Sequence, residues 1–415
     1  MKHLSKQDQQ IYQNIKNELH RQQSGLVMIP SENFTSPAVL EAMSSVLNNK
    51  YAEGYPEARY YTGNQFIDEI ENLAIERAKK LFNAEHANVQ PHSGTTANLA
   101  IYFALLKPGD KILSLNLAHG GHLSHGSKVS LVSQIYKIVH YNVDPLTNLI
   151  DYDEIREIAL NEKPQLIISG YSSYPRKVDF KFFGDIAKEV GAYHLADISH
   201  TAGLIIANEH ENPFPHADVV MTTTHKTLRG PRGAIILCKK ELAGKIDKAI
   251  FPGTQGGPFE HIIAAKAVCF EEAMTEKFKI DQKQTVKNAK ALAQTLIDND
   301  LTLITGGTDT HLILIDCRPL KISGKQAANL LAEVGIYTNA NVIPYDENPP
   351  ANPSGLRLGT PALTTQGMKE NEMKLIGQII SDLLKNPNDN SIKDKAKELV
   401  KKLTSQFPIY KDLKY

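Results

Sequence analysis

The sequence predicts an α/β protein with a mainly parallel sheet, and three observations carry this prediction. Short apolar runs bounded by turn residues alternate with helical patterns between residues 166 and 238. These runs are continuously hydrophobic rather than alternating, which is typical of strands covered on both faces. After residue 258 the pattern changes to long helical segments, followed by a unit with both strands and helices. We therefore expect a large domain with a mainly parallel sheet and a smaller C-terminal α+β domain.

The N-terminal segment places Leu4, Ile11, Ile15 and Leu19 at helical spacing among charges, and it predicts a surface arm helix. It lacks the continuous apolar region that a secretory signal needs. Residues 66–82 predict an amphipathic helix with carboxylates early and lysines late. Its apolar stripe consists of Phe66, Ile70, Leu73, Ala74, Ala78 and Leu81.

Four later runs predict buried strands. They are LIISGY at 166, AYHLAD at 192, DVVMTTT at 218 and GAIILC at 233. Further elements are a helix at FKFFGDIAKEVG, helices over about 259–298, 323–334 and 368–385, a strand at HLILIDC and a polar linker at NPNDNS. This order predicts an arm helix at residues 1–25, a large domain at 26–275 and a small domain at 276–415.

The composition argues for a small substrate. Lys plus Arg and Asp plus Glu number 46 each, so no net charge draws the protein to nucleic acid or to an anionic membrane. No eighteen apolar residues run together, so we expect no membrane span. The widely separated cysteines, Cys238, Cys269 and Cys317, predict buried free thiols in a reducing compartment. We accordingly expect a cytoplasmic protein.

Lys226 stands where the run DVVMTTT ends, and Asp197 ends the run AYHLAD 29 positions earlier. Parallel strands bring their carboxyl ends to one edge of a sheet, where α/β proteins bind ligands. A carboxylate that pairs with a ring nitrogen and a lysine that forms an imine are what a pyridoxal phosphate enzyme needs. A structural Asp–Lys ion pair explains the same residues, and for an arbitrary protein it is favoured roughly two to one.

Two glycine-containing segments are candidates for binding a phosphate. Ser93, Gly94 and Thr95 directly precede an apolar helical run, so their backbone donors would lie at a helix start. An ordinary helix cap explains this string equally well. The segment GTQGGP at 253–258 offers clustered N–H groups, but by itself it is a flexible turn.

The remaining candidates also keep alternative explanations. His119, His122 and His125 recur every third residue, yet no His-Glu-x-x-His string accompanies them, so we expect no metal site. One of these rings could stack on a flat cofactor. The segment KYAEGYPEARYYTGN surrounds Glu53 with tyrosines, which suits proton transfer or packing at an interface. Arg357, among small and apolar residues, suits a guanidinium aimed at a carboxylate.

Taken in order, eight stretches resemble serine hydroxymethyltransferases along nearly the whole chain. They are IPSENFTSP, NKYAEGYP, NVQPHSGTTAN, NLAHGGHLSHG, LADISHTAGL, TTTHKTLRGPRG, FPGTQGGP and SGLRLGTPA. The resemblance implies the aspartate-aminotransferase-like fold (fold type I) of pyridoxal phosphate enzymes. It also implies an enzyme that interconverts serine and glycine, with tetrahydrofolate accepting the one-carbon unit. The partner would be a second copy in a homodimer with shared active sites, and a homotetramer stays open.

The resemblance assigns roles residue by residue. Lys226 would hold the imine, Asp197 would pair with the pyridine nitrogen, His200 would lie beside the phenolic oxygen and His122 would stack on the ring. The other cofactor-binding positions would be Ser93, Gly94, Thr95, Ser172 and His225, with Gly257 and Tyr51 from the neighbouring subunit.

For the substrate, the resemblance implies that Arg357 binds the amino-acid carboxylate with Ser31 beside it. Tyr61 would lie near the reacting carbon, and Glu53 would handle protons from the second subunit. Folate would contact Leu117, Gly121, Leu123 and Asn341.

This sequence departs from the family pattern at Pro30, Thr62, Thr95-Thr96 and Thr254. The bulk of Thr62 and Thr254 leaves the preference among β-hydroxy and α-methyl amino acids open. The alternatives are a folate-independent aldolase on the same scaffold, a non-catalytic binding protein, and a metal hydrolase that uses His119, His122 and His125.

Overall fold

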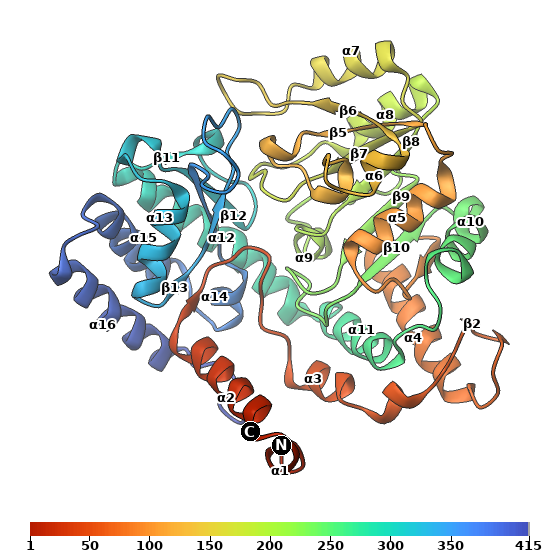
Figure 1. Cartoon of the computed structure of the whole chain (residues 1–415), viewed down its shortest axis with the longest axis horizontal. Coiled ribbons are helices and arrows are strands. Elements are labelled where there is room, and N and C mark those ends of the chain that lie inside the picture. The colour runs from red at the N-terminus through yellow and green to blue at the C-terminus, as the bar shows by residue number, and fades with distance from the viewer. Residues whose placement is uncertain (414–415) are drawn as a thin grey trace. The chain divides into compact units, whose positions relative to one another are not determined.

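The computed structural model describes residues 1–413, and the chain packs as two compact units. One unit comprises Phe34–Lys283, and the other combines Met1–Asn33 with the chain from Gln284 onward. Both contain strands and helices (Figure 1). The three-part division that the sequence predicts, with boundaries after residues 25 and 275, stays a prediction.

The unit Phe34–Lys283 contains a seven-stranded sheet among its described residues. In spatial order the strands are β4 (His86–Asn88), β10 (Ala234–Cys238), β9 (Val219–Thr223), β8 (Tyr193–Asp197), β7 (Leu166–Gly170), β5 (Lys111–Leu115) and β6 (Lys137–Tyr141). Strand β10 runs in the opposite direction to the other six strands of this sheet. The predicted mainly parallel sheet is therefore confirmed, and GAIILC forms its reversed strand.

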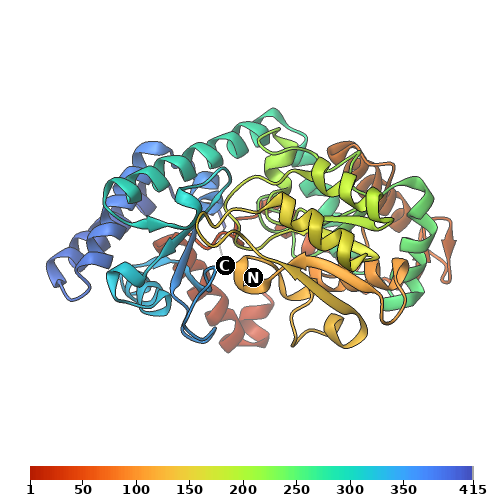
Figure 2. The same ribbon diagram turned by 90° about the horizontal axis from the view of Figure 1, so that it is seen from above.

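Helices cover both faces of this sheet (Figures 1 and 2). Adjacent strand residues point to opposite faces, so Ile167 and Val220 belong to one apolar layer while Ile168 and Met221 belong to the other. The first layer includes residues of α4 (Gln65–Phe82), α7 (Tyr152–Glu162), α8 (Phe180–Val190), α9 (Ala202–Ile206) and α11 (Glu260–Ala273). The second includes residues of α5 (Gly94–Leu105), α6 (Val132–Ile135) and α10 (Ala243–Lys248).

Short elements complete this unit and carry several candidate residues. They are α3 (Pro37–Met43), the hairpin of β2 (Gly54–Tyr55) and β3 (Ala58–Arg59), and the helical turns η1 (Val46–Asn49), η2 (Leu117–His119), η3 (Leu123–His125), η4 (Lys240–Leu242) and η5 (Ala249–Thr254).

Helix α4 corrects one prediction. Its buried residues are Ile67, Glu71, Ala74, Ala78 and Phe82. The predicted stripe was wrong at two positions, because the side chains at 66 and 73 are 65% and 49% exposed. The observed buried face of the helix differs from the predicted one and includes Glu71, which forms a buried ion pair with Arg59.

The other unit has an antiparallel sheet of four strands among its described residues. Their order is β11 (Thr302–Leu303), β12 (Leu312–Asp316), β15 (Gly355–Gly359) and β14 (Asn339–Asn341), and β1 (Leu26–Val27) separately pairs with β13 (Ile336–Tyr337). The short turns are η6 (Ile304–Gly306) and η7 (Arg318–Leu320). The helices are α1 (Leu4–Gln7), α2 (Gln9–Ser24), α13 (Gly324–Glu333), α14 (Pro361–Thr365), α15 (Glu370–Lys385), α16 (Asn390–Gln406) and the C-terminal part of α12 (Glu276–Asp298).

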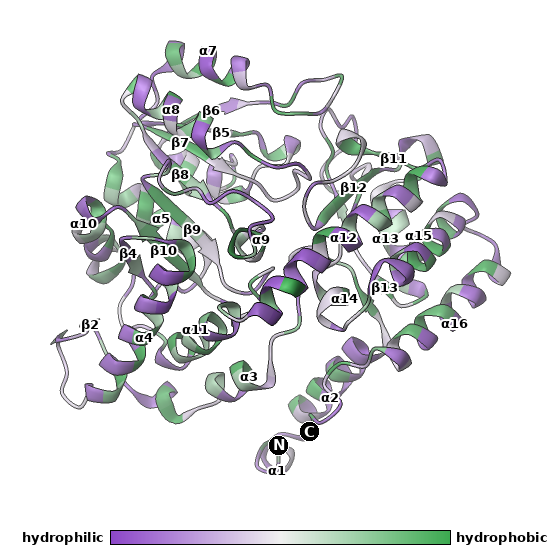
Figure 3. Cartoon of the chain, turned by 180° about the vertical axis from the view of Figure 1, so that it is seen from behind, coloured by the Kyte–Doolittle hydropathy of each residue, from purple (hydrophilic) through white to green (hydrophobic). Residues whose placement is uncertain are grey.

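The core of this unit lies between its sheet and helices, and includes Leu292, Ile313, Leu356 and Ile380. Purple and green segments alternate along α12 and α16, as expected of helices with one apolar face (Figure 3). The predicted arm helix is observed as α2, which packs against α16.

The three cysteines are buried free thiols, as predicted. Within residues 1–413, no helix combines the length and the apolar character needed to cross a lipid bilayer.

Candidate active site

The carboxyl ends of three adjacent parallel strands carry several of the predicted residues. Strands β7, β8 and β9 are neighbours, and Gly170, Asp197 and Met221 lie in register across them. Ser172, His200 and Lys226 follow these strand ends by a few residues. The segments are joined directly, because the Thr227 hydroxyl donates to the backbone carbonyl of His200 at 2.9 Å. Residues far apart in the sequence thus meet at one edge of the sheet.

Asp197 is held by hydrogen bonds to both of its carboxylate oxygens. The ring Nε2 of His125 lies 2.9 Å from Oδ2, and the amide of Asn98 donates to the same oxygen at 3.1 Å. The backbone N–H of Ser199 donates to Oδ1 at 3.1 Å. Only 7% of the Asp197 side chain is exposed, so these contacts operate with little competition from water.

The surroundings keep this carboxylate charged. Burial by itself raises the pKa of Asp197, but the hydrogen bond from His125 and the charges of His125 and His122 outweigh it. The net result is a pKa well below the ordinary value for aspartate. A buried negative charge is therefore present at neutral pH, and it suits a cationic ring nitrogen.

The turn that carries Lys226 is closed by hydrogen bonds within residues 224–233. The Thr224 N–H donates to Gly233 O at 3.0 Å, its hydroxyl donates to Pro231 O at 2.6 Å, and Gly230 N–H donates to Thr224 O at 2.7 Å. Residue 230 must be small, because an added Cβ would lie 2.6 Å from the sulfur of Cys269. The turn therefore holds the backbone at Lys226 in one conformation.

His225 precedes the lysine and is electrically neutral. Burial, followed by the charges of Arg232 and Lys226, lowers its pKa to about 3. Its Nδ1 atom and the hydroxyl of Thr223 are buried without a hydrogen-bond partner among the described residues. Unused polar atoms beside Lys226 are what a site for a polar ligand requires.

Ser93 caps helix α5 through a capping box with Thr96. The Ser93 N–H donates to the Thr96 hydroxyl oxygen at 3.1 Å, so the departure from the family pattern at 96 supports the helix start. Ser93 and Thr95 are exposed at this end. A Cβ at Gly94 would lie 2.8 Å from Thr223 Cγ2, so glycine lets the helix start approach strand β9.

The histidine loop, residues 117–126, contains the two helical turns η2 and η3. The ring Nδ1 of His122 hydrogen-bonds with the Ser124 hydroxyl at 2.8 Å, and the rings of His122 and His125 lie 5.4 Å apart. A Cβ at Gly121 would lie 2.2 Å from Leu115 O, which makes glycine necessary there. The predicted folate positions Leu117 and Leu123 are exposed by 39% and 51%.

The same loop is tied to the end of β7 through backbone hydrogen bonds. The N–H groups of Ser172 and Ser173 both donate to Gly120 O, at 2.8 and 3.3 Å. No group of three or more His, Cys, Asp or Glu side chains within residues 1–413 is arranged to hold a metal ion.

A second set of predicted residues gathers elsewhere in the same unit. The rings of Tyr51 and Tyr61 lie 5.0 Å apart, and both side chains are about half exposed. A Cβ at Gly257 would lie 3.5 Å from the Tyr51 ring, and one at Gly256 would lie 3.4 Å from Glu53 Oε1. The charge of Glu53 and a hydrogen bond to it raise the pKa of Tyr51. The residues that the resemblance assigns to a neighbouring subunit are therefore close to one another.

A third set of predicted residues lies in the unit formed by Met1–Asn33 and the chain from Gln284 onward. The Nε of Arg357 on β15 donates to Asn339 Oδ1 on β14 at 3.1 Å. Pro30, next to Ser31, packs on Gly359, where a Cβ would lie 2.6 Å from the proline Cα. Burial lowers the pKa of Arg357 to about 10, so the guanidinium stays charged at neutral pH. Asn341 ends strand β14.

The residues present fit the expected cofactor on three grounds. A charged buried carboxylate is available for a ring nitrogen, a lysine lies on a closed turn, and a twelve-residue helix presents exposed hydroxyls and N–H groups at its start. Sequence reasoning missed Asn98, and it named His125 without its contact to Asp197. Both residues contact Asp197, from which they lie 99 and 72 positions away in the chain.

Comparison with known proteins agrees with this geometry. The family model described as serine hydroxymethyltransferase matches residues 4–380. Two similar curated proteins, both called serine hydroxymethyltransferase, come from Prochlorococcus marinus strains AS9601 and MIT 9301. Each is 54% identical to this chain over 411 residues, which cover 99% of this chain and 97% of the relative.

Proposed function

Because the chain belongs to the serine hydroxymethyltransferase family, we propose that Lys226 is the residue that binds pyridoxal 5′-phosphate covalently. The chain is a pyridoxal phosphate-dependent transferase of fold type I. It interconverts serine and glycine by a retro-aldol-type cleavage and transfers the one-carbon unit to tetrahydrofolate.

One observation carries the proposed site: a charged, buried Asp197 lies in register with the strand that leads to Lys226. A carboxylate in this position keeps a ring nitrogen protonated. Pyridoxal phosphate, when bound, supplies a protonated ring that withdraws electrons from the substrate α-carbon. We assign His122 to the ring face and His200 to the phenolic oxygen. The phosphate is assigned to Ser93, Gly94, Thr95 and His225, with Gly257 from the neighbouring subunit. Ser172 is assigned as a further cofactor-binding residue.

Arg357 is proposed to bind the substrate carboxylate, with Ser31 beside it. A guanidinium binds a carboxylate through two parallel hydrogen bonds, so it also sets the rotation of the substrate. That rotation decides which bond at the α-carbon is presented for cleavage, and we assign the bond to the hydroxymethyl group. Tyr61 and Glu53 are assigned to proton transfer at the hydroxymethyl side.

Folate is assigned to Leu117, Gly121, Leu123 and Asn341. Leu117 and Leu123 are the exposed first residues of η2 and η3, and they support an apolar contact with a flat ring. A folate bound there would capture the one-carbon unit as it leaves.

We assign the chain to a homodimer in which Tyr51, Glu53 and Gly257 serve the neighbouring site. Their proximity within one chain supports this assignment, because neighbouring residues would reach the same foreign site together. The three reduced thiols support a cytoplasmic location.

The folate dependence of glycine formation tests this function. Purified protein is loaded with pyridoxal phosphate and given serine, with and without tetrahydrofolate. Rapid glycine formation that requires tetrahydrofolate supports the proposal, whereas a rate indifferent to folate favours an aldolase. Threonine and α-methylserine in parallel assays report the preference that Thr62 and Thr254 leave open.

A further inference from the structure

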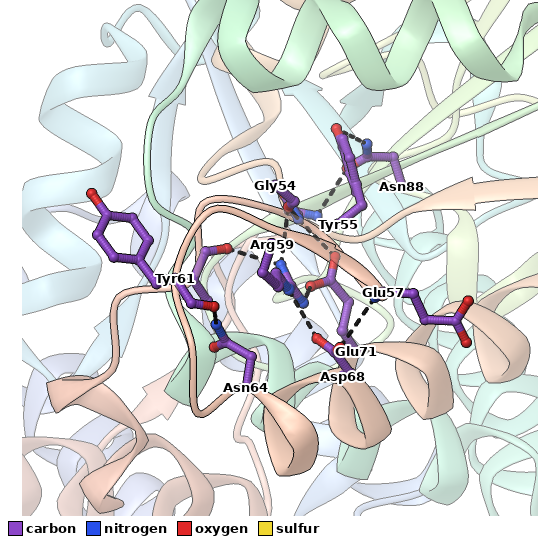
Figure 4. Close-up of polar contacts among 11 residues, drawn as sticks. Gly54, Tyr55, Glu57, Arg59, Tyr61, Asn64, Asp68, Glu71 and Asn88 are labelled. Atoms are coloured by element: carbon purple, nitrogen blue, oxygen red, sulfur yellow. Dashed lines mark hydrogen bonds and ion pairs between the residues drawn. The ribbon is translucent and has the colours of Figure 1, made fainter.

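A buried polar cluster lies beneath the Glu53 segment, and none of its members has a role so far. It is centred on Glu71 of helix α4 and includes Arg59 and Asp68 (Figure 4). Gln90 also belongs to it, through a hydrogen bond to Glu71. The side chains of Glu71 and Arg59 are only 1% and 4% exposed. Charged groups buried this deeply are costly unless they are fully paired, so their arrangement needs an explanation.

The buried guanidinium of Arg59 hydrogen-bonds to the backbone on both sides of Glu53. Its Nη1 donates to the carbonyls of Ala52 and Gly54, each at 2.9 Å. Its remaining contacts are with carboxylates: Nη2 with Glu71 at 2.5 Å, and Nε with Asp68 at 2.9 Å. The guanidinium is planar and rigid, so fixing one side of it fixes the other.

Glu71 connects this grip to a second segment. Its Oε1 accepts a hydrogen bond from the side-chain amide of Gln90 at 2.8 Å, while its Oε2 accepts from Arg59. The same Gln90 amide also donates to Gly54 O at 3.0 Å. The two oxygens of the Glu71 carboxylate therefore hold Arg59 and Gln90, and both of these side chains donate to the backbone next to Glu53.

From Gln90 the contacts continue to the start of helix α5 and to the glycine-rich loop. The Gln255 amide donates to Gln90 O at 3.1 Å, and its oxygen accepts from the His92 N–H at 3.0 Å. His92 directly precedes Ser93, and Gln255 precedes Gly257. One connected network thus contacts three segments that contain assigned site residues.

We propose that Glu71 is a positioning residue for the reaction, which holds Glu53 in place through Arg59 and Gln90. The inference rests on the proposed role of Glu53. Glutamine at position 71 has the same shape but carries one N–H₂ group, which must face a donor on Arg59 or on Gln90. One of the two links would be lost, and the backbone around Glu53 would loosen.

The test compares Glu71→Gln with Asp68→Asn as a matched control. Asp68 also contacts Arg59, but its other hydrogen bond is with the Glu57 N–H and not with Gln90. For each variant, kcat is measured per pyridoxal phosphate-loaded chain, counted by absorbance, together with the KM for serine. Backbone hydrogen exchange of peptides covering residues 51–55 is followed in the same samples.

We expect Glu71→Gln to lower kcat per loaded chain about 10- to 100-fold, because a displacement near 1 Å at a reacting group can cost about 100-fold. The KM for serine should change less than about threefold, because Arg357 and Ser31 are untouched. Exchange over 51–55 should become faster. A merely structural role would reduce the number of loaded chains and not the rate of each one.

For Asp68→Asn we expect a change in kcat below about threefold. Equal kcat values and equal exchange over 51–55 in the two variants would overturn the proposal. If Glu71→Gln does not fold, the same measurements are made on Gln90→Met. This variant removes the hydrogen bonds that Gln90 donates to Glu71 and Gly54, and it keeps every charge. Faster exchange at 51–55 and a reduced kcat support the proposal, and wild-type values overturn it.

A Glu53→Gln variant separates this inference from the proposed function. If it keeps the wild-type rate, then the role assigned to Glu53 fails, while the exchange measurement still shows whether Glu71 holds the segment. If Glu53→Gln is slow and Glu71→Gln matches wild type in rate and exchange, only the positioning role fails.

Discussion

The carboxylates of Asp197 and Glu53 are assigned to the same reaction, yet the chain holds them in different ways. Asp197 is nearly buried, and its own oxygens accept hydrogen bonds from His125, Asn98 and Ser199. The Glu53 side chain is partly exposed beside Tyr51, while the backbone on either side of it is gripped by Arg59.

The difference follows from what each group has to do. A carboxylate that balances a fixed positive charge is best held ionised by permanent donors. A carboxylate that exchanges protons must keep an oxygen available for the reaction. The contacts of Arg59 hold Glu53 through the neighbouring backbone and leave its carboxylate less enclosed than that of Asp197. The predictions below test this contrast, starting with the largest expected effect.

Substitution of Asp197 by asparagine should have the largest effect. It removes the buried charge and keeps the shape, so we expect kcat/KM to fall about 100- to 1,000-fold, as for loss of one preorganised electrostatic contact. Steady-state kinetics with serine and tetrahydrofolate measure this. The control is Asp218→Asn. Asp218 directly precedes β9, and in the wild type its carboxylate pairs with Lys239. Similar losses in both variants would contradict a special role for Asp197.

Mixed dimers test whether the two carboxylates serve different subunits. Lys226→Ala and Glu53→Gln chains, each nearly inactive alone, are unfolded, mixed and refolded together. Hybrid dimers would contain one complete site, so about a quarter of the wild-type activity should return at random pairing. Mixing Lys226→Ala with Asp197→Asn chains should restore no activity, because one subunit supplies both residues to each site and every site in the hybrid lacks one of them. If neither mixture regains activity, then Glu53 acts within its own subunit.

His125→Asn should have a smaller effect, because it leaves the charge of Asp197 in place. The hydrogen bond from His125 lowers the pKa of Asp197, so its loss raises that pKa. A carboxyl group with a depressed folded-state pKa stabilises the protein above its unfolded-state pKa, and this contribution is lost as the pH falls. Acid unfolding, followed by circular dichroism, should therefore begin at a higher pH in the variant. An unchanged acid transition would argue against the contact.

The smallest effect concerns Glu260 on α11, which is 1% exposed and has no hydrogen-bond partner for either oxygen among the described residues. Burial, then the nearby charge of Glu71, raises its pKa to about 8, with Asp68 acting in the same direction and Arg59 and Lys266 opposing. The folded state therefore binds a proton that the unfolded state releases above its own pKa near 4.5. Stability should fall as the pH rises toward 8, by at most about 1.4 kcal/mol per pH unit.

Glu260→Gln should remove this dependence. Thermal unfolding at pH 6 and at pH 8 is the measurement, and the variant should lose less stability than the wild type between them. If the two proteins lose the same amount, then Glu260 is ionised throughout this range.

Much of the sheet could be predicted from sequence, because β7, β8 and β9 are continuous apolar runs. The direction of β10 could not, since hydrophobicity carries no direction. Helix α16 was not predicted, because its start lies within the segment that was interpreted as a polar linker. There the Asp389 side chain accepts hydrogen bonds from the N–H groups of Ser391 and Ile392 and caps the helix.

The candidate site divides in the same way. Lys226 and Asp197 were predicted because each ends an apolar run, which is a local signal. Glu71 gave no such signal: a glutamate in an amphipathic helix predicts an exposed residue. Its burial depends on Arg59 and Gln90, which are 12 and 19 positions away. Partners brought together by folding are beyond the reach of a local pattern.

Covalent labelling of Lys226 tests the central claim most directly. The protein is loaded with pyridoxal phosphate, reduced with borohydride, digested, and its peptides are analysed by mass spectrometry. The account predicts that the reduced cofactor is found on the peptide that contains Lys226, and that the visible absorption band disappears on reduction. An unmodified Lys226 with the cofactor on another lysine, or with none bound, would contradict it.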